Sequence, residues 1–595
     1  MTAHYAFARS WGADPGPDGF TRFRIWAPSV AAVVLEIEGQ PPTPMDREGG
    51  GWYTTVAPVG AGARYCFRLP DGLAVPDPAS RLQAGDVHDP SVVVDPKNYA
   101  WRHAEWQGRP WNEAVVYELH AGAFGGFAGI TRRLPELKAL GITAVELMPI
   151  ADFPGRHNWG YDGVMPYAPD TAYGTPDALK TLIDTAHGLG LMVLLDVVYN
   201  HFGPDGNYLH AYAKEFFDES KHTPWGAAID FRKGAVQRFF IENALFWLLE
   251  YRFDGLRFDA VHAILQPEFL DDMAATIRSR IEPGRHVHLV LEHGGNKASH
   301  MRHGFDAQWA DDTHHCFHVM LTDESEGYYQ DFREPARLLA RCLAEGFAYQ
   351  GEVSAYGGKP RGEPSADLPT TAFVICLQNH DQIGNRAFGE RLTRLADAKA
   401  LEAAAALLLL APFVPMLFMG EEWGTERPFL YFTDHNPQLA ELVRNGRREE
   451  FKHFAAFADE RRRAQIPDPN DPDTFSASIP DFAAATEPLH RKRLALCREL
   501  LALRHRHVIP RIPGCRSTGA RAIGEAAVQS AWRMGDGTRL SIATNLGTEA
   551  VPVEPCPGAV LFQSEPGAAE AVQAGRLPSR TTVVFLAEKD EGERR

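Results

Sequence analysis

From about Pro110 onward, short apolar runs alternate along the chain with longer stretches of helical pattern. Such runs are typical of parallel strands buried on both faces, and the helical stretches between them provide the crossover connections. Eight of these units in succession predict an α/β fold with a closed (β/α)8 TIM barrel. The predicted strands lie at residues 114–117, 144–148, 192–196, 256–259, 287–292, 305–309, 372–376 and 415–419.

The segments that flank the barrel have a different pattern, with short strand-like runs separated by Gly and Pro turns. Residues 1–95, with runs at 23–26, 32–37 and 64–69, predict an N-terminal β-sandwich of a carbohydrate-binding kind. Residues 96–510 hold the catalytic barrel, its loop excursions and a helical segment at 487–507, for which we expect Thr486 as cap. Residues 511–595 predict a C-terminal β domain that ends in a charged tail over 588–595.

One uncharged apolar run, Ala403 to Met419, is almost long enough for a membrane-spanning helix. Pro412 and Pro415 divide it, which predicts the end of a helix followed by a short buried strand. The N-terminus has no basic segment followed by an apolar stretch, so we expect no signal peptide. Seven scattered cysteines without a CxxC pair fit a reducing cytoplasm better than a disulfide framework.

Charge and composition exclude several classes of protein. The chain of 595 residues has 60 basic and 77 acidic side chains and a formal net charge of −17. An acidic surface repels phosphate groups, so we expect neither a nucleic acid nor an anionic membrane as partner. Gly and Pro are numerous but follow no G-X-Y period, which excludes a collagen-like chain.

Polar clusters follow several of the predicted strands, and in a TIM barrel these strand ends surround the active site. The third strand leads into Asp196–His201, the fourth into Asp259, the fifth ends in Glu292, and the seventh leads to Asp381. A single acid at a strand end more often caps the next helix. Three acids at converging strand ends, accompanied by the basic Arg257 and two or three histidines, suit the cleavage of a glycosidic bond by a nucleophile and a proton donor.

These clusters are similar to the four ordered signature regions of the α-amylase superfamily. The matching stretches are 196–201 (DVVYNH), 253–260 (FDGLRFDA), Glu292 and 379–381 (NHD). The resemblance implies that Asp259 is the nucleophile, Glu292 the general acid/base and Asp381 the stabiliser of the transition state. It also implies that Arg257 keeps Asp259 ionised, that His201 and His380 bind hydroxyls of the reacting ring, and that Tyr161 stacks beneath that ring.

For other residues near these regions two interpretations stay open. Family members use the equivalents of Asp196 and Asn200 to brace loops or, in some cases, to bind calcium. Trp159 could pack in a loop core or form a sugar platform, and His262 could line a positive subsite or simply pack. Side chains of types that bind metals occur together at His314, His315 and Cys316. No second cluster in the sequence matches them, so we expect no metal and no organic cofactor.

Within the superfamily, three stretches are similar to the maltooligosyltrehalose trehalohydrolases: 156–163, 378–386 and 419–424 followed by 429–435. Gln382 stands where branching enzymes carry an acid, and the stretches 224–226 and 76–81 agree with the trehalohydrolases. The resemblance implies hydrolysis of the α-1,4 bond next to the terminal trehalose of maltooligosyltrehalose. Trp225 could stack on the trehalose or pin a loop. The alternatives are a 1,4-α-glucan branching enzyme and an inactive barrel that serves as a binding subunit.

Overall fold

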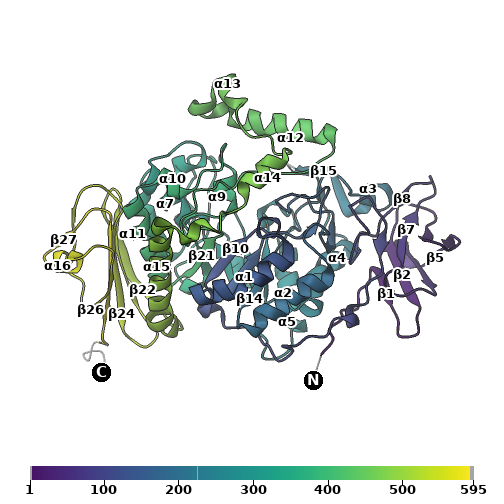
Figure 1. Cartoon of the computed structure of the whole chain (residues 1–595), viewed down its shortest axis with the longest axis horizontal. Helices are drawn as coiled ribbons and strands as arrows, with labels where there is room; N and C mark the ends of the chain where they lie inside the picture. The colour runs from purple at the N-terminus through teal and green to yellow at the C-terminus, as the bar shows by residue number, and fades with distance from the viewer. Residues whose placement is uncertain (1–2, 224, 590–595) are drawn as a thin grey trace.

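The computed structural model describes residues 3–223 and 225–589, so Pro224 and the end of the predicted charged tail (590–595) lie outside the described residues. The chain forms three regions in a row (Figure 1): an N-terminal β region, a central barrel and a C-terminal β region. Helices α12 (Pro437–Glu450) and α13 (Glu460–Arg463) rise above the barrel in this view. The exact domain boundaries at residues 95 and 510 stay a prediction.

Eight parallel strands close into a barrel in the order in which they occur along the chain, which confirms the predicted fold class. All of their side chains are buried, as expected for strands that are covered on both faces. The strands are β10 (Val116–Leu119), β11 (Ala144–Leu147), β14 (Met192–Val197), β17 (Gly255–Phe258), β18 (His288–Leu291), β19 (Ala307–Trp309), β20 (Phe373–Ile375) and β21 (Val414–Phe418).

Helices follow the barrel strands, and α12 to α14 lie in the segment after the last strand. The longer ones are α1 (Gly126–Leu140), α2 (Pro176–Gly188), α4 (Gly234–Leu245), α5 (Glu268–Arg280), α7 (Asp311–Thr322), α8 (Pro335–Glu345), α11 (Ala398–Leu410), α12 (Pro437–Glu450) and α15 (Pro488–Leu503). Shorter ones are α3 (Leu209–Tyr212), α6 (Ala298–Arg302), α9 (His380–Gly384), α10 (Leu392–Leu395), α13 (Glu460–Arg463) and α14 (Pro472–Ser478). Helix α15 begins at Pro488 after Glu487, so the expected cap Thr486 is wrong: it lies in the preceding turn.

The apolar run at 403–419 is divided as predicted. Its first part completes α11, and its second part is strand β21, with Ala411–Phe413 between them. Helix α11, Leu417 and Phe418 contribute to the main core, and Val414 and Met416 of β21 belong to a second buried cluster. Across the described ranges, no helix combines the length and apolarity needed to cross a membrane.

The N-terminal region contains two facing sheets, in agreement with the predicted sandwich. One has the order β1 (Gly12–Pro15), β2 (Thr21–Trp26), β6 (Trp52–Ala57), β5 (Asp46–Arg47); the other has the order β4 (Thr43–Pro44), β3 (Val34–Ile37), β7 (Arg64–Arg68), β8 (Ala74–Val75), with β9 (Ser91–Val92) against β7. A buried ion pair, Arg81 Nη2 to Glu250 Oε2 at 3.0 Å, joins this region to the barrel.

The C-terminal region is a five-stranded antiparallel sheet that packs against α11. Its order is β22 (Arg516–Gly524), β23 (Ala527–Arg533), β24 (Arg539–Asn545), β28 (Thr581–Ala587), β26 (Ala559–Gln563). Thr582 on β28 donates a hydrogen bond of 2.7 Å to the carbonyl of Ala403, which fixes the sheet to the barrel. Smaller elements are β12 (Ala151–Asp152), β13 (Met165–Pro169), β15 (Phe217–Thr223), β16 (Gly226–Ile229), β25 (Val551–Pro552), β27 (Arg576–Leu577) and α16 (Ala568–Gln573).

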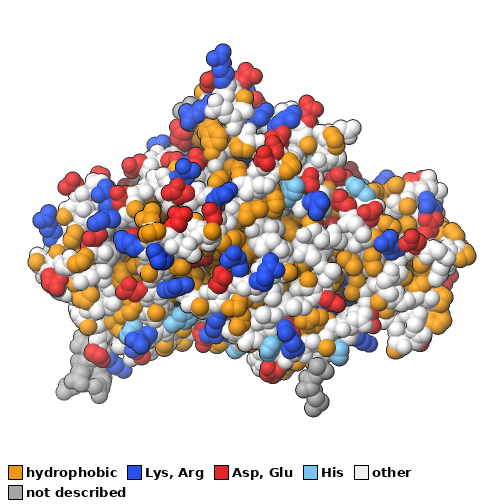
Figure 2. All heavy atoms as spheres, in the orientation of Figure 1, with side chains coloured by type: hydrophobic (Ala, Val, Ile, Leu, Met, Phe, Trp, Pro, Cys, Tyr) orange, Lys and Arg blue, Asp and Glu red, His pale blue; other side chains and the backbone are white. Residues whose placement is uncertain are grey.

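On the face shown in Figure 2, acidic and basic side chains of the described residues are interspersed, and neither sign gathers into one broad patch.

Candidate active site

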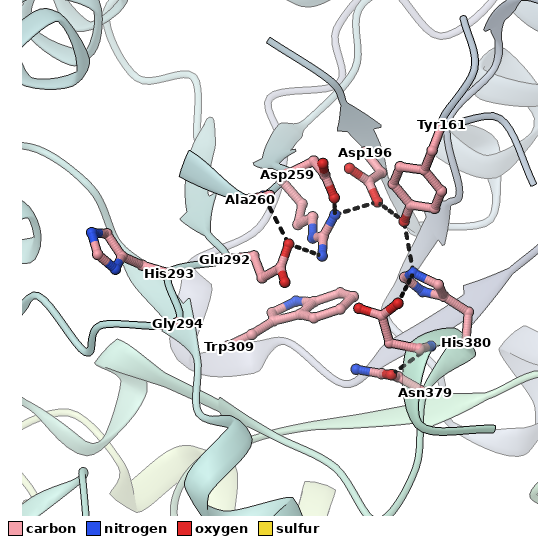
Figure 3. A network of polar contacts seen from close by, with 12 residues as sticks. Tyr161, Asp196, Asp259, Ala260, Glu292, His293, Gly294, Trp309, Asn379 and His380 are labelled. Carbon is pink, nitrogen blue, oxygen red and sulfur yellow. Dashed lines mark hydrogen bonds and ion pairs between the residues drawn. The ribbon is translucent and has the colours of Figure 1, made fainter. Parts of the chain in front are cut away.

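The carboxyl ends of neighbouring barrel strands bring the predicted acids together. Strand β17 carries Arg257 and leads into Asp259, while β18 leads directly into Glu292. The parallel ladder continues past the strands, because the amide of Glu292 donates to the carbonyl of Phe258 at 3.0 Å. Residues 33 positions apart in the sequence therefore face the same space above the barrel (Figure 3).

Arg257 lies at the centre of this cluster and its side chain is fully buried. Its Nη1 donates to Asp196 Oδ2 at 2.7 Å and to Asp259 Oδ1 at 2.9 Å, and its Nη2 donates to Glu292 Oε2 at 2.8 Å. The guanidinium also lies over the ring of Trp309, 4.0 Å from its centroid. One buried cation thus holds two of the predicted catalytic carboxyls in fixed positions, and carboxylate contacts of this kind are the stronger class of hydrogen bond.

Each of these two carboxyls has a second donor. Asn200 donates to Asp259 Oδ2 at 2.8 Å and also to its backbone carbonyl, so the residue expected to brace a loop contacts the predicted nucleophile directly. The backbone amide of Ala260 donates to Glu292 Oε2 at 2.8 Å. Ala260 has φ +39°, in the left-handed region that disfavours a side chain, and such strain is concentrated at functional sites.

The opposite wall is built by the turn after β20, which begins helix α9. Asn379 caps this helix, and its Oδ1 accepts from the backbone amides of Asp381 and Gln382. Asp381 keeps the most exposed of the three predicted catalytic carboxyls, with 37% of its side chain accessible. Burial raises the pKa of Asp381, and the neighbouring His380 opposes that shift.

A chain of hydrogen bonds links His380 to Arg257. His380 Nε2 contacts the Tyr161 hydroxyl at 2.8 Å, and that hydroxyl donates to Asp196 Oδ2 at 2.7 Å. Tyr161 also stacks on the His380 ring, with centroids 5.3 Å apart. Burial raises the pKa of Asp196 to about 7, against the opposing charge of Arg257.

Other predicted binding residues lie around this centre. Both ring nitrogens of His201 have protein partners, Asn200 Oδ1 and the carbonyl of Tyr161. Trp225 stacks on the His201 ring at 4.4 Å, and 47% of Trp225 is exposed. His262 is exposed and its Nδ1 accepts from the amide of Gly294. Trp159 is only 4% exposed and stacks on Phe429, a placement that favours loop core over sugar platform.

Two acids near this centre were not identified from the sequence. Glu118 on β10 contacts His380 and is 1% exposed. Asp311 begins α7 just after β19, and burial together with the carboxylates of Glu292 and Asp381 raises its pKa to about 8. Glu118 could have been identified from the sequence, because it is a charged residue inside an otherwise apolar strand pattern.

The arrangement of the possible metal-ligand side chains can be examined directly. Within residues 3–223 and 225–589, no group of three or more His, Cys, Asp or Glu side chains is arranged to hold an ion. His314 instead bonds the carbonyl of Leu377, and Cys316 lies in the core.

Two family models match the chain. The model described as "Alpha amylase, catalytic domain" matches residues 99–226, and the model described as "Domain of unknown function (DUF3459)" matches residues 515–585. The first match ends before the strand that carries Asp259, so it covers only the beginning of the barrel.

Curated relatives cover more of the chain. It is 41% identical to the malto-oligosyltrehalose trehalohydrolase of Deinococcus radiodurans, over 83% of this chain and 82% of that protein. The protein of the same name from Saccharolobus solfataricus is 41% identical over 73% and 79%. The 1,4-alpha-glucan branching enzyme of Jannaschia sp. is 33% identical over only 43% of this chain and 41% of that protein.

Solved structures agree in fold. A Salmonella typhimurium protein, provisionally described as an alpha amylase, superposes with a TM-score of 0.92 at 43% identity, covering 98% of this chain and 100% of that one. A pullulanase from Paenibacillus barengoltzii, crystallised with maltotetraose, has a TM-score of 0.70 at 20% identity over 98% and 96%, which is a likeness of fold alone.

Proposed function

The chain belongs to the malto-oligosyltrehalose trehalohydrolase family, and we propose from that premise that it hydrolyses the α-1,4 bond next to the terminal trehalose of maltooligosyltrehalose. The products are trehalose and a shortened maltooligosaccharide. The observation that supports the proposal is that Asp259 and Glu292 both accept from one buried guanidinium, in a chain that is 41% identical to a relative of that name over 83% of its length.

The reaction proceeds in two steps with net retention of configuration. An Asp259 oxygen attacks the anomeric carbon, the bond from that carbon to the leaving oxygen breaks, and the proton of Glu292 passes to that oxygen. Glu292, now ionised, then takes a proton from water while the water oxygen attacks the same carbon and displaces Asp259. Retaining enzymes place the two carboxyls about 5–5.5 Å apart, which suits two acids that share one guanidinium.

The surrounding contacts support specific roles in this reaction. Arg257 and Asn200 hold the Asp259 carboxylate in position for attack, since both donate to it. We assign Asp381 to the hydroxyls of the reacting ring and to stabilisation of its distorted form. Tyr161 and His380 provide a rigid stacked surface beside it.

Specificity for trehalose requires a wall beyond the leaving group, because trehalose is a compact disaccharide that does not continue as a glucan chain. Trp225 has an exposed face and a rigid support, since its other neighbour is the stacked His201 ring. We assign Trp225 to stacking on the trehalose and His262 to hydrogen bonding of its hydroxyls. Sites that bond particular hydroxyls reject substrates that lack them.

We also place the enzyme in the cytoplasm. The support is chemical: all seven cysteines are free thiols, and six of them are buried.

The test is incubation of the purified enzyme with maltotriosyltrehalose and, separately, with maltopentaose, followed by chromatography of the sugars. Free trehalose from the first substrate and slow turnover of the second are expected. A third incubation, with amylose, tests the branching alternative, because new α-1,6 branches would point to a branching enzyme. Rapid cleavage of maltopentaose with no trehalose from maltotriosyltrehalose would refute the proposed specificity.

A further inference from the structure

Glu118 is a buried acid that the mechanism above does not use. It lies on β10, the first strand of the barrel, and 1% of its side chain is exposed. Its Oε1 accepts from His380 Nδ1 at 2.5 Å, and its Oε2 accepts from the backbone amide of His380 at 3.2 Å. Both carboxylate oxygens thus hold the same residue, one through the ring and the other through the chain that leads into Asp381.

The proton positions follow from the partners. The Tyr161 hydroxyl has a single proton and donates it to Asp196, so its oxygen accepts from His380 Nε2. His380 Nδ1 in turn donates to the Glu118 carboxylate. Both ring nitrogens of His380 therefore carry protons, and the ring is an imidazolium.

The path continues without a break to the reacting groups. From His380 it runs through Tyr161 and Asp196 to Arg257, which donates to Asp259 and Glu292. A neutral His380 ring has one N–H for two acceptors, so it would lose its hydrogen bond to either Tyr161 or Glu118. Figure 3 shows the portion from His380 to Glu292 as a row of contacts along the barrel mouth.

We propose that Glu118 is a positioning residue, which holds His380 as an imidazolium and thereby fixes the Tyr161 ring and the hydrogen-bonded path to Arg257. Glu118 acts only through His380. The inference rests on the proposed glycosidase chemistry and deepens it, because it names a residue outside the reacting groups that sets the pH range of the reaction.

The electrostatics of His380 agree with this role. Burial favours the neutral ring, but the carboxylates of Glu118 and Asp381 outweigh it and raise the pKa of His380 to about 9. The charged and titratable groups that face the ring are Glu118 on β10, His120 after it, Glu146 on β11, Tyr161, Arg257 on β17 and Asp381. Arg257 opposes the charge on His380, so Glu118 and Asp381 are the groups that sustain it.

The chain offers a matched control in Glu146. It is the register partner of Glu118 on β11, and it is 2% exposed. Burial and the neighbouring carboxylates raise its pKa well above the ordinary value, and its Oε1 has no partner among the described residues. Glu146→Gln therefore changes a buried carboxyl that has no hydrogen bond to His380 among the described residues, whereas Glu118→Gln removes the carboxylate that accepts from His380.

The experiment measures kcat/KM on α-maltosyl fluoride from pH 5 to pH 10. Fluoride leaves without a proton, so this substrate removes the requirement for Glu292 as acid and exposes the titration of His380. The wild type and Glu146→Gln are expected to keep their activity up to about pH 9. Loss of a neighbouring opposite charge moves a pKa by about 1–3 units, so Glu118→Gln should lose activity at correspondingly lower pH. A shift of two units means about a tenfold deficit at pH 8 and almost none at pH 5.5.

A second readout does not depend on activity. The pKa of His380 is higher in the folded than in the unfolded chain, so it stabilises the fold below pH 6.5 and loses that contribution as the pH rises through 9. The gap in Tm between wild type and Glu118→Gln should therefore be widest below pH 6.5 and shrink toward pH 10. Inactivity of the wild type on every substrate would overturn the proposed function, and the Tm arm would still decide the role of Glu118.

A uniform loss of activity at all pH values, or an unchanged profile together with a constant Tm gap, would overturn the inference. If Glu118→Gln does not fold, Glu118→Asp takes its place. That variant keeps the charge but withdraws the carboxylate by one methylene, so it should lower kcat/KM with a profile close to that of the wild type. A profile shifted as far as expected for the Gln variant would contradict the importance of the charge.

Discussion

Replacement of Arg257 by Lys tests whether one guanidinium organises the active site. Arg257 makes three charge-assisted hydrogen bonds to carboxyls and is fully buried. A lysine ammonium is compact and has no planar fork, so it can keep about one of these contacts. Hydrogen bonds to charged groups contribute about 1.5–3 kcal/mol each, so the loss of two is about 3–6 kcal/mol. At 1.36 kcal/mol per tenfold in rate, kcat/KM should fall by about 10²- to 10⁴-fold.

The matched control is Arg504→Lys. Arg504 is equally buried, but it donates to backbone carbonyls of Leu409, Ala411 and Phe413 at the end of α11. Its replacement should lower Tm and leave kcat/KM on maltotriosyltrehalose within about twofold at a temperature where the variant is folded. The assay is initial-rate kinetics with Tm measured on the same samples. A folded Arg257→Lys that retains a tenth or more of the wild-type kcat/KM, or equal losses in the two variants, would refute the organising role of Arg257.

Two further changes test the binding wall and the buried acids. Trp225→Ala should lower kcat/KM on maltotriosyltrehalose by about 10- to 200-fold and leave maltopentaose turnover nearly unchanged. Equal losses on both substrates, together with a lower Tm, would assign Trp225 to loop packing alone. The pKa of Asp196 is about 7 in the folded chain, above its unfolded value, so its contribution to stability is present at low pH and is lost as the pH rises through 7. Asp196→Asn should therefore flatten the fall in Tm between pH 4 and pH 8, and an unchanged slope would contradict the assignment of that titration to Asp196.

The barrel could be predicted from the sequence because its strands are buried on both faces. Such strands appear as uninterrupted apolar runs, and all eight predicted runs overlap the observed strands. The ends of these runs then indicate where polar side chains converge, which explains why Asp259 and Glu292 lie together as expected. The predicted helix cap at Thr486 is wrong because that residue ends a turn of 3-10 helix, and α15 begins two residues later, at Pro488 after Glu487.

The contacts among the side chains could not be predicted in the same way. Glu118 is a single polar residue within an apolar run, and its partner His380 is 262 positions away. The two meet because the barrel closes: β21 pairs with both β10, which carries Glu118, and β20, which leads into His380. The stacking of Trp225 on His201 depends likewise on the course of the hairpin β15–β16 over the barrel. Tertiary closure, rather than local pattern, decides these details.

Time-resolved proton NMR of maltotriosyltrehalose during hydrolysis tests both the substrate and the mechanism of the enzyme. The anomeric signals distinguish trehalose from reducing sugars and report which anomer of maltotriose appears first. We expect trehalose and α-maltotriose in equal amounts from the wild type, and no release of either above the uncatalysed rate from a folded Asp259→Asn variant. Appearance of β-maltotriose first, or trehalose release by Asp259→Asn at the wild-type rate, would contradict a retaining trehalohydrolase with Asp259 as nucleophile.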